Sequence, residues 1–318
     1  MNFWSTQRVL VTGGTGFLGR HLVKALHSQS VKKVVAVGSK DYDLTHEDQV
    51  QKMFKEAKPD VVFHLAGLVG GILANKQRPA DFFYRNLMMG TLVMHHACRE
   101  GAAKFVGAGA GCGYPEFAPM PLKESDLWSG MPQRESAPYS LAKRLLSIQA
   151  EAYNKQFNFT SIICIPGNIY GEFDNFNLND SHVIPALVRK FVEATRNGRP
   201  TVEVWGSGTP TRDYIYAGDA ALGMLRAAEV YSGSQVVNLS SGREASIREV
   251  CGILQRLTQF KGEVVWNTER PSGQQRRYFD ISKAQAELGF AAPTSLEDGL
   301  QRTVTWFQKN IDSAELRK

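Results

Sequence analysis

Short apolar runs without polar alternation recur along the first half of the chain. They lie at Val9–Val11, Val34–Val37, Val61–Leu65, Phe105–Ala108 and Ser161–Ile165. Runs of this length that are rich in valine and isoleucine are typical of strands buried on both faces of a parallel sheet. Longer stretches with helical spacing separate them, so we expect a doubly wound, Rossmann-type α/β fold.

The pattern changes after Ile165. Residues 166–212 are rich in Asn, Gly, Asp and Pro and hold one helical stretch, His182–Asn197. A strand-like piece at Gln235–Leu239 and a helical stretch at Leu296–Asn310 follow. We therefore predict two domains with a ligand cleft between them. Residues 1–165 and about 213–240 would form the NADP-binding Rossmann domain, and about 166–212 and 241–318 a smaller C-terminal α/β substrate-binding domain.

Composition indicates a globular protein and narrows its partners. Of 318 residues, 43% are hydrophobic and 21% are charged, which is ordinary for soluble domains. No stretch is long and apolar enough to span a bilayer, and the first residues lack the features of a signal peptide, so we expect a cytoplasmic protein without a membrane partner. The net charge of +6 is spread without a basic run, which argues against a nucleic-acid partner and suits an enzyme that holds diphosphates.

The cysteines and histidines show no metal-binding pattern. Cys98, Cys112, Cys164 and Cys251 lie far apart without CxxC spacing, and the seven histidines have no ligand spacing. A chain of this length needs no covalent cross-links to build a core. We therefore predict neither a disulfide framework nor a metal site.

Three glycines, Gly13, Gly16 and Gly19, follow the first predicted strand and open a segment with helical spacing. The pyrophosphate of a dinucleotide binds at such a helix N-terminus, and side chains in the turn would block its approach. The spacing differs from the GxGxxG fingerprint, and on the turn alone a purely structural loop is an alternative. The strand before it and the helical pattern after it favour a dinucleotide site.

The end of the second predicted strand bears on the choice of nicotinamide cofactor. An acidic residue there would bind the ribose 2′-hydroxyl of NAD, but this chain has Ser39 and Lys40. Both side chains can bind a phosphate, so we predict NADP, with a solvent-facing Lys40 as the alternative. Further cofactor contacts are expected from Asp43, Leu44, Leu65, Ala66 and Gly67.

Tyr139 and Lys143 are four residues apart, which places them on one face of a predicted helix. A tyrosine hydroxyl is a poor acid-base group at its usual pKa of about 10, and we expect the Lys143 ammonium and the positive charge of the nicotinamide to lower that pKa. A YxxxK spacing is common by chance, but with the glycine turn it indicates a proton-transfer pair. The helix should begin near Ser136, with Pro138 in its first turn and a buried stripe of Leu141, Leu145 and Ile148.

Longer segments carry a more specific resemblance. From about Arg8 to Asn310 the chain is similar to the GDP-L-fucose synthase family, extended short-chain dehydrogenase/reductases that act with NADPH on GDP-4-keto-6-deoxy-mannose. The matching segments are residues 39–45, 64–71, 112–115, 174–177, 181–185 and 204–210. The segments at 174–177 and 181–185 discriminate best, because many sugar-nucleotide enzymes share the cofactor motifs.

The resemblance implies the roles of four residues. Cys112 and His182 would move protons at C3 and C5 of the sugar, beside the C4 ketone. Tyr139 would donate a proton to the C4 oxygen as NADPH reduces that carbon, and Lys143 would hold Tyr139 and the ribose. Taken singly, Cys112 would be interpreted as a small buried residue and His182 as a helix cap, and it is the matching segments around them that favour the catalytic roles.

The resemblance also assigns ligands. Further NADP contacts would come from Phe17, Leu18, Asn86, Pro166, Asn168, Ile169 and His182. The substrate would be held by Asn168, Lys190, Trp205, Arg212 and Arg277. Among these Arg212 is the firmest, because a planar guanidinium binds diphosphate oxygens in pairs. Either Lys190 or its neighbour Arg189 could be the inward residue.

Two departures from the family leave the reaction open. The family carries Ser or Thr two to three residues before the cysteine, where this chain has Ala110, and Thr before the Asn of Pro166-Gly167-Asn168. Loss of one hydrogen-bond donor at a reacting oxygen costs a few kcal/mol of transition-state stabilisation. Three functions therefore stay open: a GDP-4-keto-6-deoxy-mannose epimerase-reductase, a non-reducing nucleotide-sugar epimerase, and a non-enzymatic NADP-sensing protein. By analogy with extended-type relatives we expect a homodimer.

Overall fold

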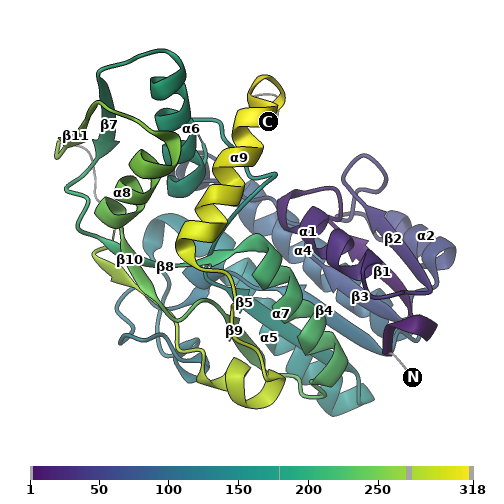
Figure 1. Ribbon diagram of the computed structural model, residues 1–318. Coiled ribbons are helices and arrows are strands. Elements are labelled where there is room, and N and C mark those ends of the chain that lie inside the picture. The colour runs from purple at the N-terminus through teal and green to yellow at the C-terminus, as the bar shows by residue number, and fades with distance from the viewer. Residues whose placement is uncertain (1–2, 179, 270–273, 315–318) are drawn as a thin grey trace.

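A six-stranded sheet forms the centre of the computed structural model, which describes residues 3–178, 180–269 and 274–314 (Figure 1). Its strands are β1 (Arg8–Thr12), β2 (Lys33–Val37), β3 (Val61–His64), β4 (Lys104–Ala108), β5 (Thr160–Pro166) and β9 (Val236–Leu239). They lie in the order β2-β1-β3-β4-β5-β9, and every neighbouring pair is parallel. The strand order reverses between β1 and β3, where α/β sheets bind ligands at their carboxyl edge.

Helices cover both faces of this sheet. One face carries α1 (Phe17–His27) and α7 (Ala217–Val230), and the other carries α2 (Glu47–Ala57), α4 (Pro79–Arg99) and α5 (Ala137–Phe157) (Figure 1). Phe105 and Val106 are adjacent in β4 and are buried in the separate cores on the two faces. The predicted doubly wound α/β fold is therefore confirmed. No helix within the described ranges is long and apolar enough to cross a membrane.

The C-terminal part contains further, smaller sheets (Figure 1). In one of them β8 (Thr211–Tyr216) pairs with β6 (Asn168–Tyr170), β10 (Glu244–Ser246) and β12 (Arg276–Arg277), and elsewhere β7 (Thr201–Trp205) pairs with β11 (Glu263–Asn267). Around a third core lie α6 (Val183–Arg196), α8 (Ile247–Thr258) and α9 (Leu296–Ala314). The short elements are η1 (Phe3–Thr6), α3 (Ile72–Gln77), η2 (Gly111–Gly113), η3 (Glu124–Asp126), η4 (Arg134–Ser136) and the π-helical η5 (Ala284–Leu288).

Most predicted elements are found within a residue or two of their expected bounds. The strand β2 differs in burial, because it lies at the edge of the sheet and only Val37 in it is fully buried. The piece predicted at Gln235–Leu239 is β9 of the central sheet, whereas residues 213–216 belong to β8 in the second sheet. The division into two domains stays a prediction.

The helix α5 begins as predicted, with Ser136 as its N-cap and Pro138 in its first turn. Its predicted buried stripe is wrong, since Leu145 and Ile148 are 37% and 44% exposed. The buried face instead contains Ala142, Leu146 and Ala150, together with polar residues. The small residues on this face allow α4 to pack closely against α5. Part of the apolar surface of α5 therefore faces outward, away from the core.

Candidate active site

The glycine turn lies between β1 and α1, where the strand order reverses. Gly13 has a φ of +70°, and a Cβ there would lie 2.7 Å from the amide nitrogen of Ala66. A Cβ at Gly19 would lie 2.1 Å from the carbonyl oxygen of Gly13. Gly16 is the N-cap of α1 and supplies no side-chain cap, so the first amides of the helix can bind an anion. The turn fits a dinucleotide.

The end of β2 lies directly beside this turn. A Cβ at Gly38 would lie 2.3 Å from Oγ1 of Thr15. Ser39 and Lys40 follow with exposed side chains, next to the glycine turn. The amide of Gly38 donates a hydrogen bond of 2.8 Å to Oδ2 of Asp41, a residue that sequence reasoning left out. Asp41 thereby shapes the turn that presents the two residues expected to bind a phosphate.

Some of the expected cofactor residues are engaged within the protein. Oδ1 of Asp43 accepts hydrogen bonds from the amide and hydroxyl of Thr45, at 3.0 and 2.7 Å, and these hold the pKa of the Asp43 carboxyl below its usual value. Leu44 and Leu18 pack against the cores of the two faces. Because the side chains of Leu18 and Leu44 pack in the cores, it is the backbone atoms of these residues that can contact a ligand. The ring of Phe17 packs edge-on against His21.

The segment after β3 is held by Asn86 of α4. Its side-chain oxygen accepts a hydrogen bond from the amide of Leu68, and its side-chain nitrogen donates to the Leu68 carbonyl, each at 3.0 Å. A Cβ at Gly67 would lie 3.0 Å from Oδ1 of Asn86 and 3.8 Å from Nζ of Lys143. Leu65 and Ala66 lie against Gly13. The structure therefore gathers these expected cofactor residues in one place.

Tyr139 and Lys143 lie in the first two turns of α5, beside this segment. The Tyr139 ring packs edge-on against Phe82, with centroids 6.1 Å apart. Burial raises the pKa of Tyr139, and the neighbouring Cys112 raises it further, so the expected lowering by Lys143 is wrong here. Burial lowers the pKa of Lys143 to about 8, and Cys112 opposes this shift. A phenol that keeps its proton is suited to donate it.

Cys112 lies in the η2 turn at the carboxyl end of β4 and is half-buried. Nη2 of Arg277 donates a hydrogen bond to the carbonyl oxygen of Gly111. On the other side, Nε of Arg144 donates to the carbonyl oxygen of Gly113 at 2.9 Å. Burial lowers the pKa of both arginines, and the nearby Cys112 opposes this shift. Ala110 is the N-cap of the same turn.

Arg212 and Arg277 lie directly beside each other, in register on the parallel strands β8 and β12. Burial lowers the pKa of both guanidinium groups, and Arg212 lowers that of Arg277 further. Like charges held side by side are unfavourable unless an anion lies between them. Two guanidinium groups placed in this way could bind an anion such as a diphosphate.

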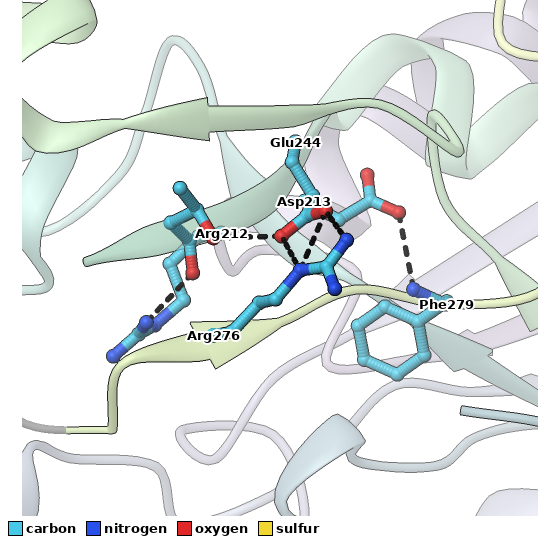
Figure 2. Close-up of polar contacts among 6 residues, drawn as sticks. Arg212, Asp213, Glu244, Arg276 and Phe279 are labelled. Carbon is cyan, nitrogen blue, oxygen red and sulfur yellow. Dashed lines mark hydrogen bonds and ion pairs between the residues drawn. The ribbon is translucent and has the colours of Figure 1, made fainter. Parts of the chain in front are cut away.

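The strand neighbours of this pair, Asp213 and Arg276, are fixed by polar contacts, and Figure 2 shows the contact between Asp213 and the amide of Phe279. Asp213, which is fully buried, accepts hydrogen bonds from the amide and hydroxyl of Ser241, at 3.0 and 2.6 Å, and from the amides of Gly242 and Phe279, at 3.2 and 3.4 Å. Burial raises the pKa of Asp213, and these bonds oppose that shift. Arg276 is paired with Glu244, whereas the guanidinium of Arg212 points away from that pair (Figure 2).

Asn168, Ile169 and Pro166 connect the central sheet to β8. The Asn168 side chain donates a hydrogen bond of 3.0 Å to the carbonyl oxygen of Asp213. Ile169 pairs in register with Ile215, and a Cβ at Gly111 would lie 3.3 Å from the carbonyl oxygen of Pro166. These residues therefore lie between the Cys112 turn and the arginine pair.

Lys190 and Trp205 meet at one edge of the C-terminal part. Nζ of Lys190 lies 5.6 Å from the centroid of the Trp205 ring and donates a hydrogen bond of 2.8 Å to the Glu203 carbonyl. The neighbouring Arg189 forms an ion pair with Glu193 at 2.7 Å. Trp205 is 56% exposed.

His182 is the N-cap of α6 and makes no side-chain cap bond. Its side chain is exposed, yet the surrounding protein lowers the pKa of the imidazole by desolvation, against the effect of Asp180. A Cβ at Gly71 would lie 3.6 Å from the Asp180 carbonyl, which places this loop beside the segment after β3. Among the described residues, no hydrogen bond or ring contact joins His182 to Cys112 or Tyr139.

The structure thus brings together most of the predicted site and adds residues to it. Cys112, Tyr139 and Lys143 lie within electrostatic reach of one another. Arg144 was missed, although it follows Lys143 directly, because a sequence does not show that an arginine is buried. Within the described ranges, no group of three or more His, Cys, Asp or Glu residues could hold a metal ion.

Comparisons with known proteins agree with this geometry. The model of the NAD dependent epimerase/dehydratase family matches residues 9–240. GDP-L-fucose synthase 1 of Arabidopsis thaliana is 37% identical over 304 residues, which are 96% of this chain and 94% of that protein. GDP-L-fucose synthase of Escherichia coli strain K12 is 34% identical over 317 residues, 97% of this chain and 98% of that protein.

Solved structures extend the comparison to the fold. The crystal structure of a GDP-L-fucose synthetase from Naegleria fowleri bound to NADP superposes with a TM-score of 0.90 at 29% identity. The alignment covers 96% of this chain and 95% of that one. The resemblance found in the sequence is confirmed, and the chain belongs to the NAD dependent epimerase/dehydratase family, in the group that contains the GDP-L-fucose synthases.

Proposed function

We propose that this protein is an NADPH-dependent epimerase-reductase of a GDP-4-keto-6-deoxy sugar, and that its product is GDP-L-fucose. The observation that carries the proposal is the convergence of Cys112, Tyr139 and Lys143 beside the arginine pair Arg212 and Arg277. A thiol, a phenol and an anion site at one sheet edge match the needs of a sugar diphosphate that is first epimerised and then reduced. The cofactor is NADP(H), which the glycine turn, Ser39 and Lys40 would hold.

The epimerisation needs a base and an acid on opposite sides of the sugar ring. The C4 ketone acidifies the hydrogens at C3 and C5, and the Cys112 thiolate removes one of these protons. The imidazole of His182 returns a proton from the opposite face. Desolvation by the surrounding protein lowers the pKa of this imidazole and so favours its neutral form, and His182 therefore takes up a proton from solvent before it donates one.

The reduction uses the residues on α5. Bound NADPH supplies the hydride for C4. The protonated phenol of Tyr139 donates its proton to the C4 oxygen, and the Lys143 ammonium holds the ribose and steadies the phenolate that is formed. Arg212 and Arg277 bind the diphosphate, Asn168 lies nearer the sugar, and Lys190 with Trp205 receives the base.

Ala110 favours a second candidate, a non-reducing epimerase of nucleotide sugars that keeps its nicotinamide tightly bound. The turn that carries Cys112 offers no hydroxyl at position 110, where the family's serine or threonine would contact the ketone. A missing donor slows reduction more than proton exchange, because in reduction the C4 oxygen must take up a proton, whereas in exchange the proton returns to carbon and the ketone is restored. The presence of Tyr139 and Lys143 favours the epimerase-reductase over this second candidate.

Incubation with GDP-4-keto-6-deoxy-mannose separates these candidates. NADPH absorbance reports reduction, and deuterium uptake from D₂O, read by mass spectrometry, reports epimerisation. We expect both signals; deuterium uptake without NADPH oxidation would identify the non-reducing epimerase. The Tyr139→Phe variant should lose oxidation and keep exchange, and Cys112→Ala should do the reverse. Equal loss of both signals in both variants would contradict the division of roles.

We also propose a homodimer that pairs α4 and α5. The side chains of Leu145 and Ile148 lie three residues apart on α5 and are 37% and 44% exposed. The adjacent α4 exposes Phe83 and Tyr84, at 37% and 57%. An apolar helix face of this kind is typical of a self-association surface. Light scattering should give twice the chain mass of 35.3 kDa, and Leu145→Glu should give the monomer; a wild-type monomer would rule out the dimer.

A further inference from the structure

Arg144 is a buried cation whose guanidinium has no carboxylate partner within the described ranges. It is 4% exposed and follows Lys143 on α5. All of its hydrogen bonds go to backbone carbonyls, through Nε and Nη2 to Gly113 and through Nη1 to Gly130 at 2.9 Å. A buried charge without a counterion is costly, which suggests that the charge itself serves a purpose.

The guanidinium is held in a fixed orientation. Its central carbon lies 4.9 Å from the centroid of the Trp128 ring, a stacked cation–π arrangement. The Trp128 indole nitrogen donates a hydrogen bond of 3.4 Å to Oγ of Ser147, one turn further along α5. The Ser147 hydroxyl in turn donates to the Arg144 carbonyl at 2.8 Å. Trp128 and Arg144 therefore support each other.

The Arg144 guanidinium holds the turn that carries Cys112 by hydrogen bonds. Two of its nitrogens donate to the carbonyl oxygen of Gly113, immediately after the cysteine, while Arg277 donates to the carbonyl oxygen of Gly111, immediately before it. The turn that carries Cys112 is thus held on one side by the buried guanidinium of Arg144 and on the other by the partly buried guanidinium of Arg277. The other ionisable groups that face its sulfur are Tyr139 and Lys143 from α5.

We propose that Arg144 is a positioning residue for Cys112: it fixes the η2 turn through the Gly113 carbonyl and supplies a permanent positive charge that favours the thiolate. The charge of Arg144 does not depend on pH, whereas the Lys143 ammonium can lose its proton as the pH rises. Burial lowers the pKa of Arg144, and Cys112 opposes that shift. The inference rests on the proposed role of Cys112 as a base, but its test needs no substrate.

The test is the pH profile of Cys112 alkylation. Iodoacetamide reacts with the thiolate, and mass spectrometry of the Cys112 peptide separates it from the other three cysteines. In Arg144→Gln the midpoint should move upward by about 1 pH unit or more, because an opposite charge is lost nearby. Arg144→Lys keeps the charge and should retain most of the wild-type midpoint. The matched control is Arg196→Gln, an exposed arginine near the end of α6, which should leave the midpoint unchanged.

The result that overturns the proposal is a folded Arg144→Gln protein, judged by near-UV circular dichroism, with the wild-type midpoint. If that variant does not fold, the same measurement is made on Trp128→Leu. This substitution removes the ring on which the Arg144 guanidinium stacks, so the charge remains but is held less firmly. A smaller upward shift supports the proposal, and an unchanged midpoint refutes it. Failure of turnover on the GDP-sugar would refute the proposed function and leave this measurement unaffected.

Discussion

Replacing Lys143 by methionine should make the protein more stable and less active. Lys143 is 5% exposed, and no hydrogen bond or ion pair to its ammonium is found within the described residues. Burial lowers its pKa from the usual 10.5 to about 8. Methionine has a similar shape and carries no charge, so the Lys143→Met protein avoids this cost of burial.

The magnitude follows from the pKa. The gap between 10.5 and about 8 corresponds to about 3 kcal/mol, at about 1.4 kcal/mol per pKa unit. Below pH 8 the ammonium is charged in both the folded and the unfolded protein, and folding bears the full cost. As pH rises from 8 toward 10.5 the folded protein loses the proton first, so the cost shrinks. The Lys143→Met variant should therefore be about 3 kcal/mol more stable at pH 7 and about 1.4 kcal/mol more stable at pH 9.5.

Urea unfolding at the two pH values, without added nucleotide, measures these differences. Lys155→Met is the matched control, because Lys155 is exposed near the end of the same helix, and its effect should stay within about 0.5 kcal/mol. NADPH oxidation by the Lys143→Met variant should be lost. A Lys143→Met protein that is less stable than wild type at pH 7, or a difference that does not shrink at pH 9.5, would refute the reasoning.

Three further predictions concern other parts of the site. Ala110→Ser should raise NADPH oxidation by roughly 10-fold or more relative to deuterium exchange, because it restores a donor to the ketone; an unchanged ratio would mean that another group serves this role. Asp213→Asn should lower the free energy of unfolding in urea by about 2–4 kcal/mol, since the amides of Gly242 and Phe279 lose their shared acceptor Oδ2; a loss under about 0.5 kcal/mol would contradict the importance of these bonds. Lys40→Ala should weaken NADPH binding by about 10-fold and leave NADH binding unchanged, as measured by fluorescence titration; equal effects on both would place Lys40 away from the 2′-phosphate.

The central sheet was predictable because its strands are buried on both faces. Such strands need continuous apolar sequence, and Val61–Leu65 and Ser161–Ile165 show it plainly. The outward face of α5 was not predictable, because Leu145 and Ile148 have the spacing of a core stripe whichever surface covers them. The periodicity of a sequence indicates that a helix has an apolar face, but it does not indicate which surface packs against that face.

The parts of the site that depend on local backbone geometry could be predicted from sequence motifs. The parts that depend on contacts between residues far apart in the chain were less predictable. Gly13 and the Tyr139–Lys143 pair act through short-range geometry, so their spacing is informative. The pKa of Tyr139 was predicted in the wrong direction, because burial outweighs the nearby ammonium and burial is set by the fold. The role of Arg144 depends on Gly113 and Gly130, which no spacing rule connects to it.

The side-by-side placement of Arg212 and Arg277 has a practical consequence for anyone who handles the protein. If this pair binds the substrate diphosphate as we propose, it should also bind other doubly charged oxyanions in the buffer, sulfate and inorganic phosphate included. Such ions would compete with a sugar nucleotide, so affinities measured in phosphate buffer would come out too weak, and melting temperatures too high, in comparison with a chloride buffer of equal ionic strength.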